Sequence, residues 1–189
     1  MTAPDAKNRL LKQHTQTLTP KKPGKPAVTV KVDESARLRE IRALVRTNNR
    51  SKMNDDMVIC QIWVESSFDA KTNNDGAKGL MQLRRPAVQQ VLINRQRAVA
   101  GHALSDIKSN VAKQQGSIAF ESESIFDEAT NIQMGTEYLQ YQIDRTGSEM
   151  EGYIAYRGMR TQYFDVINNC ADNLSRDADN VQVLHDANK

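Results

Sequence analysis

The sequence lacks long apolar runs and has few aromatic residues, cysteines and histidines. No stretch approaches the roughly 18 apolar residues of a membrane-spanning helix, so no membrane span is expected. The first residues, MTAPDAKNRLLKQH, have neither an apolar core nor a small-residue cleavage site, and a Sec signal is not expected. The spacing of His14, His102 and His185 does not fit a metal site, and no phosphate loop or dinucleotide fingerprint occurs. We therefore expect neither a metal nor a cofactor.

Positive charge is concentrated at the start of the chain. The net charge is +3, but residues 1–32 carry seven lysines and arginines against Asp5, so the remainder is acidic. Nucleic-acid binding would require base-stacking aromatics or a recognition motif beside this charge, and the segment has neither. Together with Pro20, Pro23 and Pro26, the charge predicts a flexible, basic, Pro-rich segment over residues 1–32. A single folded domain is expected over residues 33–189.

Apolar residues recur at helical spacing through most of the remaining chain, which predicts a mainly α fold. Asp33 precedes the first amphipathic stretch, Pro86 suits the first turn of a later helix, and Gly147 suits the end of another. The helices are expected at about 34–48, 54–65, 86–99, 105–120, 132–146 and 149–159, with two more after residue 161.

Glu65 ends one of these predicted helices. Asn54 is a plausible N-cap, and the apolar periodicity stops at Ser66. The helix dipole disfavours negative charge at a C-terminal end, and nearby Trp63 and Phe68 would desolvate the carboxylate, so both effects are expected to raise the pKa of Glu65. A general acid that works near neutral pH needs such a shift. A lone glutamate near a helix end is nevertheless usually a solvated surface residue.

Three ordered motifs change that interpretation. Glu65-Ser66-x-Phe68, a short polar loop and then Gly76-Ala77-x-Gly79-Leu80-Met81-Gln82-Leu83 resemble the signature of the lysozyme-like lytic transglycosylases, the soluble lytic transglycosylase and goose-type lysozyme group. The segments Asn131-Ile132-x-x-Gly135-x-x-Tyr138-Leu139 and Ala155-Tyr156-Arg157-Gly158 resemble later motifs of the same family. The resemblance covers about residues 54–160 and leaves residues 96–120 unexplained.

This resemblance implies a lysozyme-like helical domain with a catalytic groove, in which a very small β element is allowed. It implies that Glu65 protonates the β-1,4 glycosidic oxygen between N-acetylmuramic acid and N-acetylglucosamine. Glu65 then takes the proton of the C6 hydroxyl, which closes onto C1 to give a 1,6-anhydro sugar. The substrate-binding residues that it implies are Ser66, Gly79, Met81, Gln82 and Tyr156.

Several of these roles have alternatives. The Ser66 hydroxyl either orients Glu65 or bonds to its own helix backbone. Gly76 and Gly79 would let the loop backbone approach the glycan, and Tyr156 is either a site residue or a packing tyrosine. Two positions depart from the family pattern: Arg157 replaces an asparagine that lines the sugar site, and Arg84 replaces a frequent methionine. The Arg84 cation would contact lactyl or peptide carboxylates.

A second carboxylate would change the chemistry. Hydrolytic glycosidases use two carboxyl groups, and the candidates here, Asp69, Asp75 and Glu137, stand in no recognisable motif. Three functions are therefore compared: a lytic transglycosylase, a hydrolytic muramidase with a second acid such as Asp75, and a non-catalytic glycan-binding module.

The two cysteines are Cys60, within the Glu65 helix, and Cys170. A buried free thiol at Cys60 is the expected state. The alternative is a disulfide that ties the C-terminal region to this helix, which an oxidising compartment would allow.

The expected place of action is the periplasm or cell wall, because peptidoglycan lies outside the cytoplasmic membrane. Without a Sec signal, export by a specialised route is expected. The routes considered are a type VI or related effector used against rival bacteria, a component of a secretion machine, and a phage lysis protein. The expected partners are peptidoglycan strands, the secretion machinery and, for an antibacterial effector, an immunity protein.

Overall fold

The computed structural model describes residues 15–18, 28–31, 33–158 and 162–187. The first two of these segments form an antiparallel pair of strands, β1 (Thr15–Leu18) and β2 (Val28–Lys31), with Thr15 opposite Lys31. The composition of residues 1–32 did not predict this pairing. The rest of that segment lies outside the described residues, so its flexibility and the domain boundary at residue 33 stay predictions.

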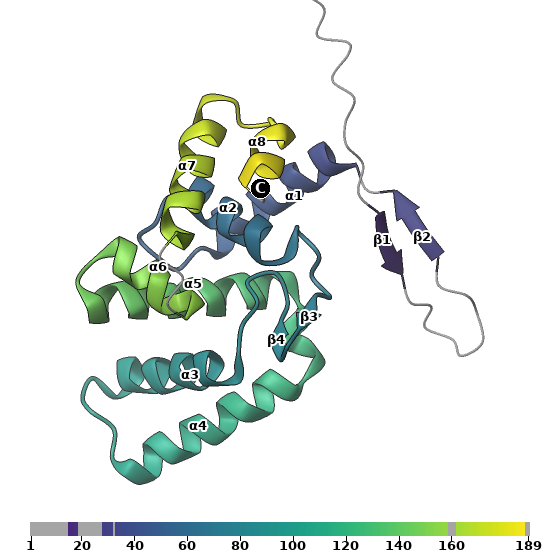
Figure 1. Ribbon diagram of the computed structural model, residues 1–189. Coiled ribbons are helices and arrows are strands. Elements are labelled where there is room, and N and C mark those ends of the chain that lie inside the picture. The colour runs from purple at the N-terminus through teal and green to yellow at the C-terminus, as the bar shows by residue number, and fades with distance from the viewer. Residues whose placement is uncertain (1–14, 19–27, 32, 159–161, 188–189) are drawn as a thin grey trace, which may run out of the picture.

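The remainder is built mainly from helices, as predicted (Figure 1). A very small antiparallel sheet is present, β3 (Asn73–Asn74) with β4 (Ala77–Lys78). The helices are α1 (Glu34–Asn48), α2 (Asp55–Ser66), α3 (Arg85–Ala100), α4 (Asp106–Glu121), the 3-10 turn η1 (Glu123–Phe126), α5 (Glu128–Thr146), α6 (Glu149–Arg157), α7 (Tyr163–Arg176) and α8 (Val181–Ala187).

Local capping signals explain where several helices begin and end. The Asp33 side chain accepts the backbone N–H groups of Ser35 and Ala36, and Asn54 accepts that of Met57, as expected of N-caps. Gly147 ends α5 with φ of 75°, a left-handed conformation that favours glycine. The predicted boundaries of these helices are therefore confirmed to within a few residues.

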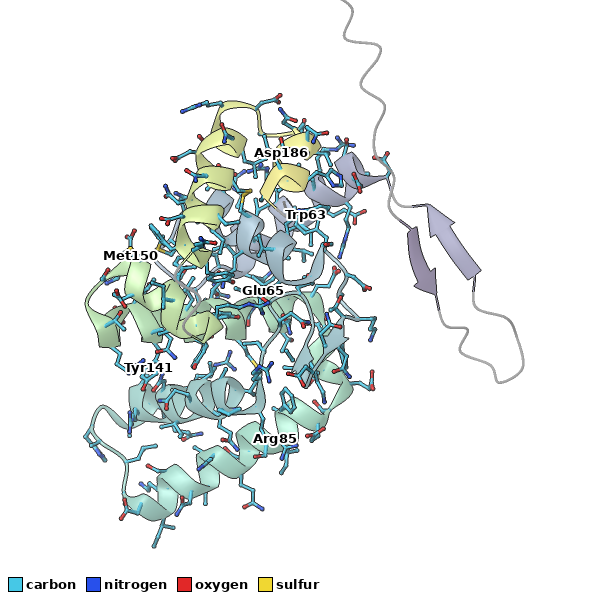
Figure 2. All side chains as sticks on the ribbon, in the orientation of Figure 1. Trp63, Glu65, Arg85, Tyr141, Met150 and Asp186 are labelled. Carbon is cyan, nitrogen blue, oxygen red and sulfur yellow. A yellow bond between two sulfur atoms is a disulfide. The ribbon has the colours of Figure 1, made fainter. Side chains whose placement is uncertain are left out.

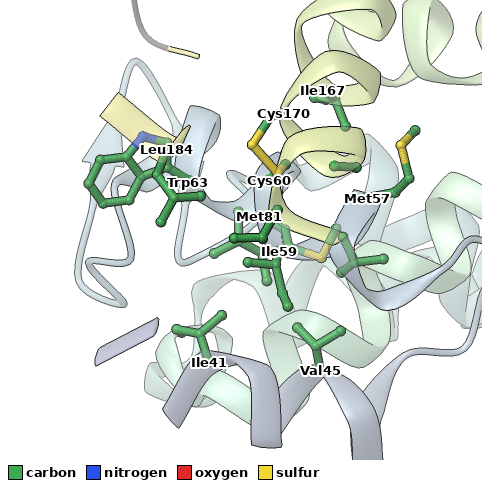
Figure 3. Close-up of a cluster of buried hydrophobic side chains, with 14 of the residues drawn as sticks. Ile41, Val45, Met57, Ile59, Cys60, Trp63, Met81, Ile167, Cys170 and Leu184 are labelled. Atoms are coloured by element: carbon green, nitrogen blue, oxygen red, sulfur yellow. A yellow bond between two sulfur atoms is a disulfide. The ribbon is translucent and has the colours of Figure 1, made fainter. Parts of the chain in front are cut away.

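α2 is the central helix of the domain. An amphipathic face was expected, but every residue from Met57 to Trp63 is buried. The reason is that α1, α7 and α8 all pack against α2. Figure 3 shows part of this core, including Ile41 of α1, Ile59 of α2 and Leu184 of α8.

Cys60 and Cys170 form a disulfide, so the expectation of a free thiol at Cys60 was wrong and the alternative is confirmed (Figure 3). The bond joins α2 to α7 across 110 residues of sequence. Close packing of α2 against α7 brings the two Cα atoms to 6.0 Å, within the range that a disulfide spans.

The α3–α4 hairpin forms the other side of the domain (Figure 1). Residues 96–120, which the resemblance left unexplained, supply the end of α3 and most of α4. Gly116 lies where a Cβ atom would be 2.5 Å from the Cα of Gln89, so the absence of a side chain lets α4 lie close to α3. The buried residues of this side include Leu83, Val88, Phe120 and Met134.

Candidate active site

Glu65 lies near the middle of the molecule (Figure 2). It borders a pocket of about 320 Å³. The pocket walls come from the end of α2, the loop before α3, the start of α3, α5 and the end of α6. Its lining residues are Glu65, Gln82, Leu83, Arg84, Pro86, Ala87, Tyr138, Ala155, Tyr156, Arg157 and Gly158. The first and third sequence motifs, together with Tyr138 of the second, therefore meet at one pocket.

The Glu65 side chain is almost fully buried and both of its oxygens have partners. Its exposed fraction is 1%, and it lies in the last turn of α2, which ends where Ser67 adopts the left-handed conformation. The Tyr163 hydroxyl of α7 donates a hydrogen bond to Oε1. The Nη1 atom of Arg157, on α6, lies 2.5 Å from Oε2. Three helices thus hold one carboxyl group.

Two opposing influences act on the charge of Glu65. Burial and the C-terminal end of α2 disfavour the ionised carboxylate, as expected from the sequence. The Arg157 guanidinium favours it, and the sequence argument did not include this contact. The expected neighbours also differ, because Trp63 packs against Phe68 and His185 and neither Trp63 nor Phe68 lines the pocket.

Two tyrosine hydroxyls support the site from α6 and α7. The Tyr156 hydroxyl donates to the carbonyl oxygen of Met81 at 2.7 Å. Burial first, and then the charge of Glu65, raise the pKa of both Tyr156 and Tyr163 well above the usual tyrosine value. Both hydroxyls therefore keep their protons and act as hydrogen-bond donors. Sequence reasoning found Tyr156 but missed Tyr163, which lies beyond the last motif and was marked only as the start of an amphipathic helix.

The structure places three predicted substrate-binding residues behind the pocket rather than in its lining. Ser66 Oγ donates to the Ile62 carbonyl oxygen, so its hydroxyl bonds to its own helix, as the alternative foresaw. A Cβ atom on Gly79 would lie 2.2 Å from the Asn131 side chain, so this glycine permits packing within the protein. Met81 is fully buried and fills the space beside Gly135 of α5.

Gln82 lines the pocket, but its amide group also supports the loop. Nε2 donates to the carbonyl oxygens of Gly79 and Thr72, at 2.9 and 3.2 Å. The Gln82 backbone has φ of 46°, a conformation that costs free energy for a residue other than glycine. The loop contacts hold this conformation. The Oε1 atom accepts no hydrogen bond from the described residues, which leaves an acceptor for a ligand.

The candidate second carboxylates lie elsewhere. Asp75 pairs with Arg84 at 3.2 Å, and its side chain is 93% exposed. Asp69 accepts the backbone N–H of Lys71, and Glu137 pairs with Arg95 beside a different cavity. Glu65 is thus the one carboxylate among the described residues that line the pocket. No group of three or more potential metal ligands occurs in the described ranges.

A family model described as "Transglycosylase SLT domain" matches residues 44–169. The chain belongs to the transglycosylase SLT family. The matched region runs from the end of α1 into α7, so it includes Glu65, Arg157 and Tyr163. Comparison with curated proteins and with solved structures gave no match. The SLT domain places the chain among peptidoglycan transglycosylases and lysozyme-like enzymes in general, with peptidoglycan as the substrate class.

Proposed function

We propose that the protein is a peptidoglycan lytic transglycosylase that cleaves the β-1,4 bond between N-acetylmuramic acid and N-acetylglucosamine and leaves a 1,6-anhydro end. The observation that carries this proposal is that the described residues lining the pocket include a single carboxylate, Glu65. Glycoside hydrolases of the common two-carboxylate type place one carboxyl group on each face of the sugar. A reaction in which the sugar supplies its own nucleophile needs only one.

Glu65 performs both proton transfers. In its protonated form it gives its proton to the glycosidic oxygen as the bond from that oxygen to C1 breaks. The resulting carboxylate takes the proton of the C6 hydroxyl as O6 forms a bond to C1, and Glu65 is protonated again. No water enters the product. Because O6 and C1 belong to the same sugar, the ring closure benefits from a high effective concentration.

The other pocket residues position the glycan and Glu65. Tyr163 orients Oε1 of Glu65 through its hydroxyl, and Tyr156 fixes the loop that carries Gln82 by bonding to Met81. Gln82 lines the pocket, and its Oε1 atom serves as an acceptor for a sugar hydroxyl or amide. Ser66, Gly79 and Met81 act indirectly, by holding α2 and this loop in place.

Mass analysis of digested peptidoglycan tests the proposal. Products that all end in anhydro sugars support a lytic transglycosylase. Reducing ends identify a hydrolytic muramidase, and an Asp75→Asn variant then shows whether Asp75 is the second acid. Binding to peptidoglycan without turnover identifies a non-catalytic module.

The place of action follows from the substrate class. Peptidoglycan lies outside the cytoplasmic membrane, so we infer action in the periplasm or cell wall. In the described part of the chain, no helix has the length and apolar character needed to cross a membrane. A specialised export route and an immunity protein that covers the Glu65 pocket stay predictions. Co-purification of a protein that protects peptidoglycan from the wild-type enzyme tests the second.

A further inference from the structure

Arg157 creates a difficulty for the chemistry just proposed. Its guanidinium lies 2.5 Å from Oε2 of Glu65. A carboxylate in such an ion pair is held in its ionised form and has no proton to donate. The contact therefore describes a resting state, and it must change before Glu65 acts as a general acid. This inference rests on the proposed function.

The position of Arg157 allows the contact to change. Arg157 is the last residue of α6, and Gly158 follows it with φ of 82° and open space where a Cβ atom would lie. The Arg157 side chain is 31% exposed, against 1% for Glu65. Among the described residues Glu65 is its one hydrogen-bond partner, through Nη1. A guanidinium has five N–H donors, so most of them remain for another acceptor.

Among the described residues, the pocket lining offers two guanidinium groups to an anionic ligand, Arg84 and Arg157, beside one carboxylate, Glu65. Arg84 is already paired with Asp75 at the exposed rim. Planar guanidinium groups bind carboxylates well because two N–H groups match two oxygens. The lactyl side chain of N-acetylmuramic acid offers such a group in glycan strands without stem peptides, because an attached peptide converts this carboxyl group into an amide.

We propose that Arg157 determines the specificity of the enzyme. Its guanidinium binds Glu65 in the resting state, and a carboxylate on the muramoyl sugar draws it away from Glu65. As the guanidinium turns to the substrate carboxylate, the positive charge of Arg157 moves away from the buried Glu65. The carboxylate then takes a proton from solvent and becomes the acid that cleaves the glycosidic bond. The charge in the site balances, because the incoming anion replaces the negative charge that protonation removes. A glycan strand without such a carboxylate leaves Arg157 bound to Glu65.

Arg157 contributes a cation that contacts Glu65 directly. Tyr156 of α6 and Tyr163 of α7 are neutral donors, and Tyr138 of α5, which lines the same pocket, is neutral as well, since burial raises the pKa of all three. Arg84 lines the same pocket from the loop before α3 but pairs with Asp75. Removal of the Arg157 charge thus keeps Glu65 protonated to higher pH, and the alkaline limb of the kcat/KM profile moves upward.

The test compares Arg157→Asn with Arg157→Lys, which keeps a cation, and with Arg84→Ala, which removes a cation that does not touch Glu65. We expect the alkaline limb of kcat/KM to rise by about one pH unit in Arg157→Asn. In the other two variants it stays near the wild-type position. A limb that does not move in Arg157→Asn overturns the proposal, and circular dichroism confirms that each variant is folded.

A matched pair of substrates tests the release step. Peptide-free glycan strands are used with free lactyl carboxylates or with the same carboxylates blocked as methylamides. For the wild type we expect kcat/KM to fall about tenfold on the blocked strand, whereas Arg157→Asn discriminates less than about twofold. Equal wild-type rates on both strands overturn the proposed role of Arg157 but do not contradict the proposed function. A wild type that cuts neither strand nor intact peptidoglycan refutes the proposed function itself.

Discussion

Two glutamates of this protein form ion pairs with arginines beside cavities, and they differ in burial and in number of partners. Glu65 is 1% exposed, and its two oxygens are held separately by Arg157 and Tyr163. Glu137 of α5 is 26% exposed, and both of its oxygens bond to Arg95 of α3, at 2.8 and 2.9 Å. The cavity beside Glu137 has a volume of about 410 Å³.

This difference in burial and in partners distinguishes the Glu137–Arg95 pair, which is structural, from the Glu65–Arg157 pair, which belongs to the candidate site. Glu137 and Arg95 match each other in a planar, bidentate arrangement that joins α3 to α5 and engages both carboxylate oxygens. Arg157 contacts a single oxygen of Glu65 and borders open pocket space. A buried carboxylate whose cation is partly exposed and incompletely bonded is able to change its charge when a ligand arrives.

The largest expected effect separates the two glutamates directly. Glu65→Gln should reduce the rate of peptidoglycan cleavage by about 10²- to 10⁴-fold, because the amide neither donates nor accepts the proton at working pH. The matched Glu137→Gln should stay within about twofold of the wild type. Release of soluble muropeptides measures both rates. Comparable losses in the two variants would remove the distinction between them.

Removal of the disulfide tests how much the covalent link between α2 and α7 stabilises the domain. Cys60 and Cys170 tie α2 to the helix that carries Tyr163, across 110 residues. In the Cys60→Ser/Cys170→Ser variant we expect a loss of about 4 kcal/mol of stability, and a melting temperature lower by about 10 °C. Reduced wild-type protein should melt at the same temperature as the double variant. An unchanged melting temperature in both would contradict the prediction.

The Tyr163→Phe variant tests one hydrogen bond that Glu65 has and Glu137 lacks, the bond from the Tyr163 hydroxyl. The phenyl ring keeps the packing of α7, but Oε1 of Glu65 loses its donor. We expect kcat to fall about tenfold with little change in KM, because the hydroxyl orients Glu65 rather than the substrate. Tyr141→Phe, on the Glu137 side, is the control and should retain full activity. A rise in KM alone would instead place the Tyr163 hydroxyl in substrate binding.

The Arg84–Asp75 pair, exposed at the pocket rim, should matter least. Arg84→Ala is expected to raise KM for peptidoglycan about threefold, since an exposed ion contact contributes less than about 1 kcal/mol. Its kcat should not change. Steady-state kinetics on soluble glycan strands measure both constants. Unchanged glycan binding by this variant would end the idea that Arg84 contacts substrate carboxylates.

Local signals in the sequence predicted much of the fold. Asp33 and Asn54 are N-caps because their side chains bond to nearby backbone N–H groups, and such contacts are readable within a few residues. Gly135, part of the second motif, lies where a Cβ atom would meet the Met81 side chain, so this glycine permits close packing. The burial of Glu65 was also predicted, but through Trp63 and Phe68 rather than through α6 and α7.

Contacts between distant segments were harder to predict. The Cys60–Cys170 bond depends on how α7 packs against α2, and neither helix encodes that contact locally. The same holds for Tyr163, 98 residues from Glu65 in the sequence. Arg157 was recognised as a departure from the family pattern, but its partner was not. The predicted roles of Ser66, Gly79 and Met81 came from resemblance, which does not separate residues that touch a ligand from those that support the loop.

Cleavage of peptidoglycan in water labelled with heavy oxygen tests the role of Glu65 most directly. If one carboxylate acts first as acid and then as base, the oxygen that closes onto C1 is the sugar's own O6. The account therefore predicts that the new muramoyl ends are one water lighter than a reducing sugar and contain no label. Labelled oxygen at C1 in the initial products would show that water attacks, and would contradict the account.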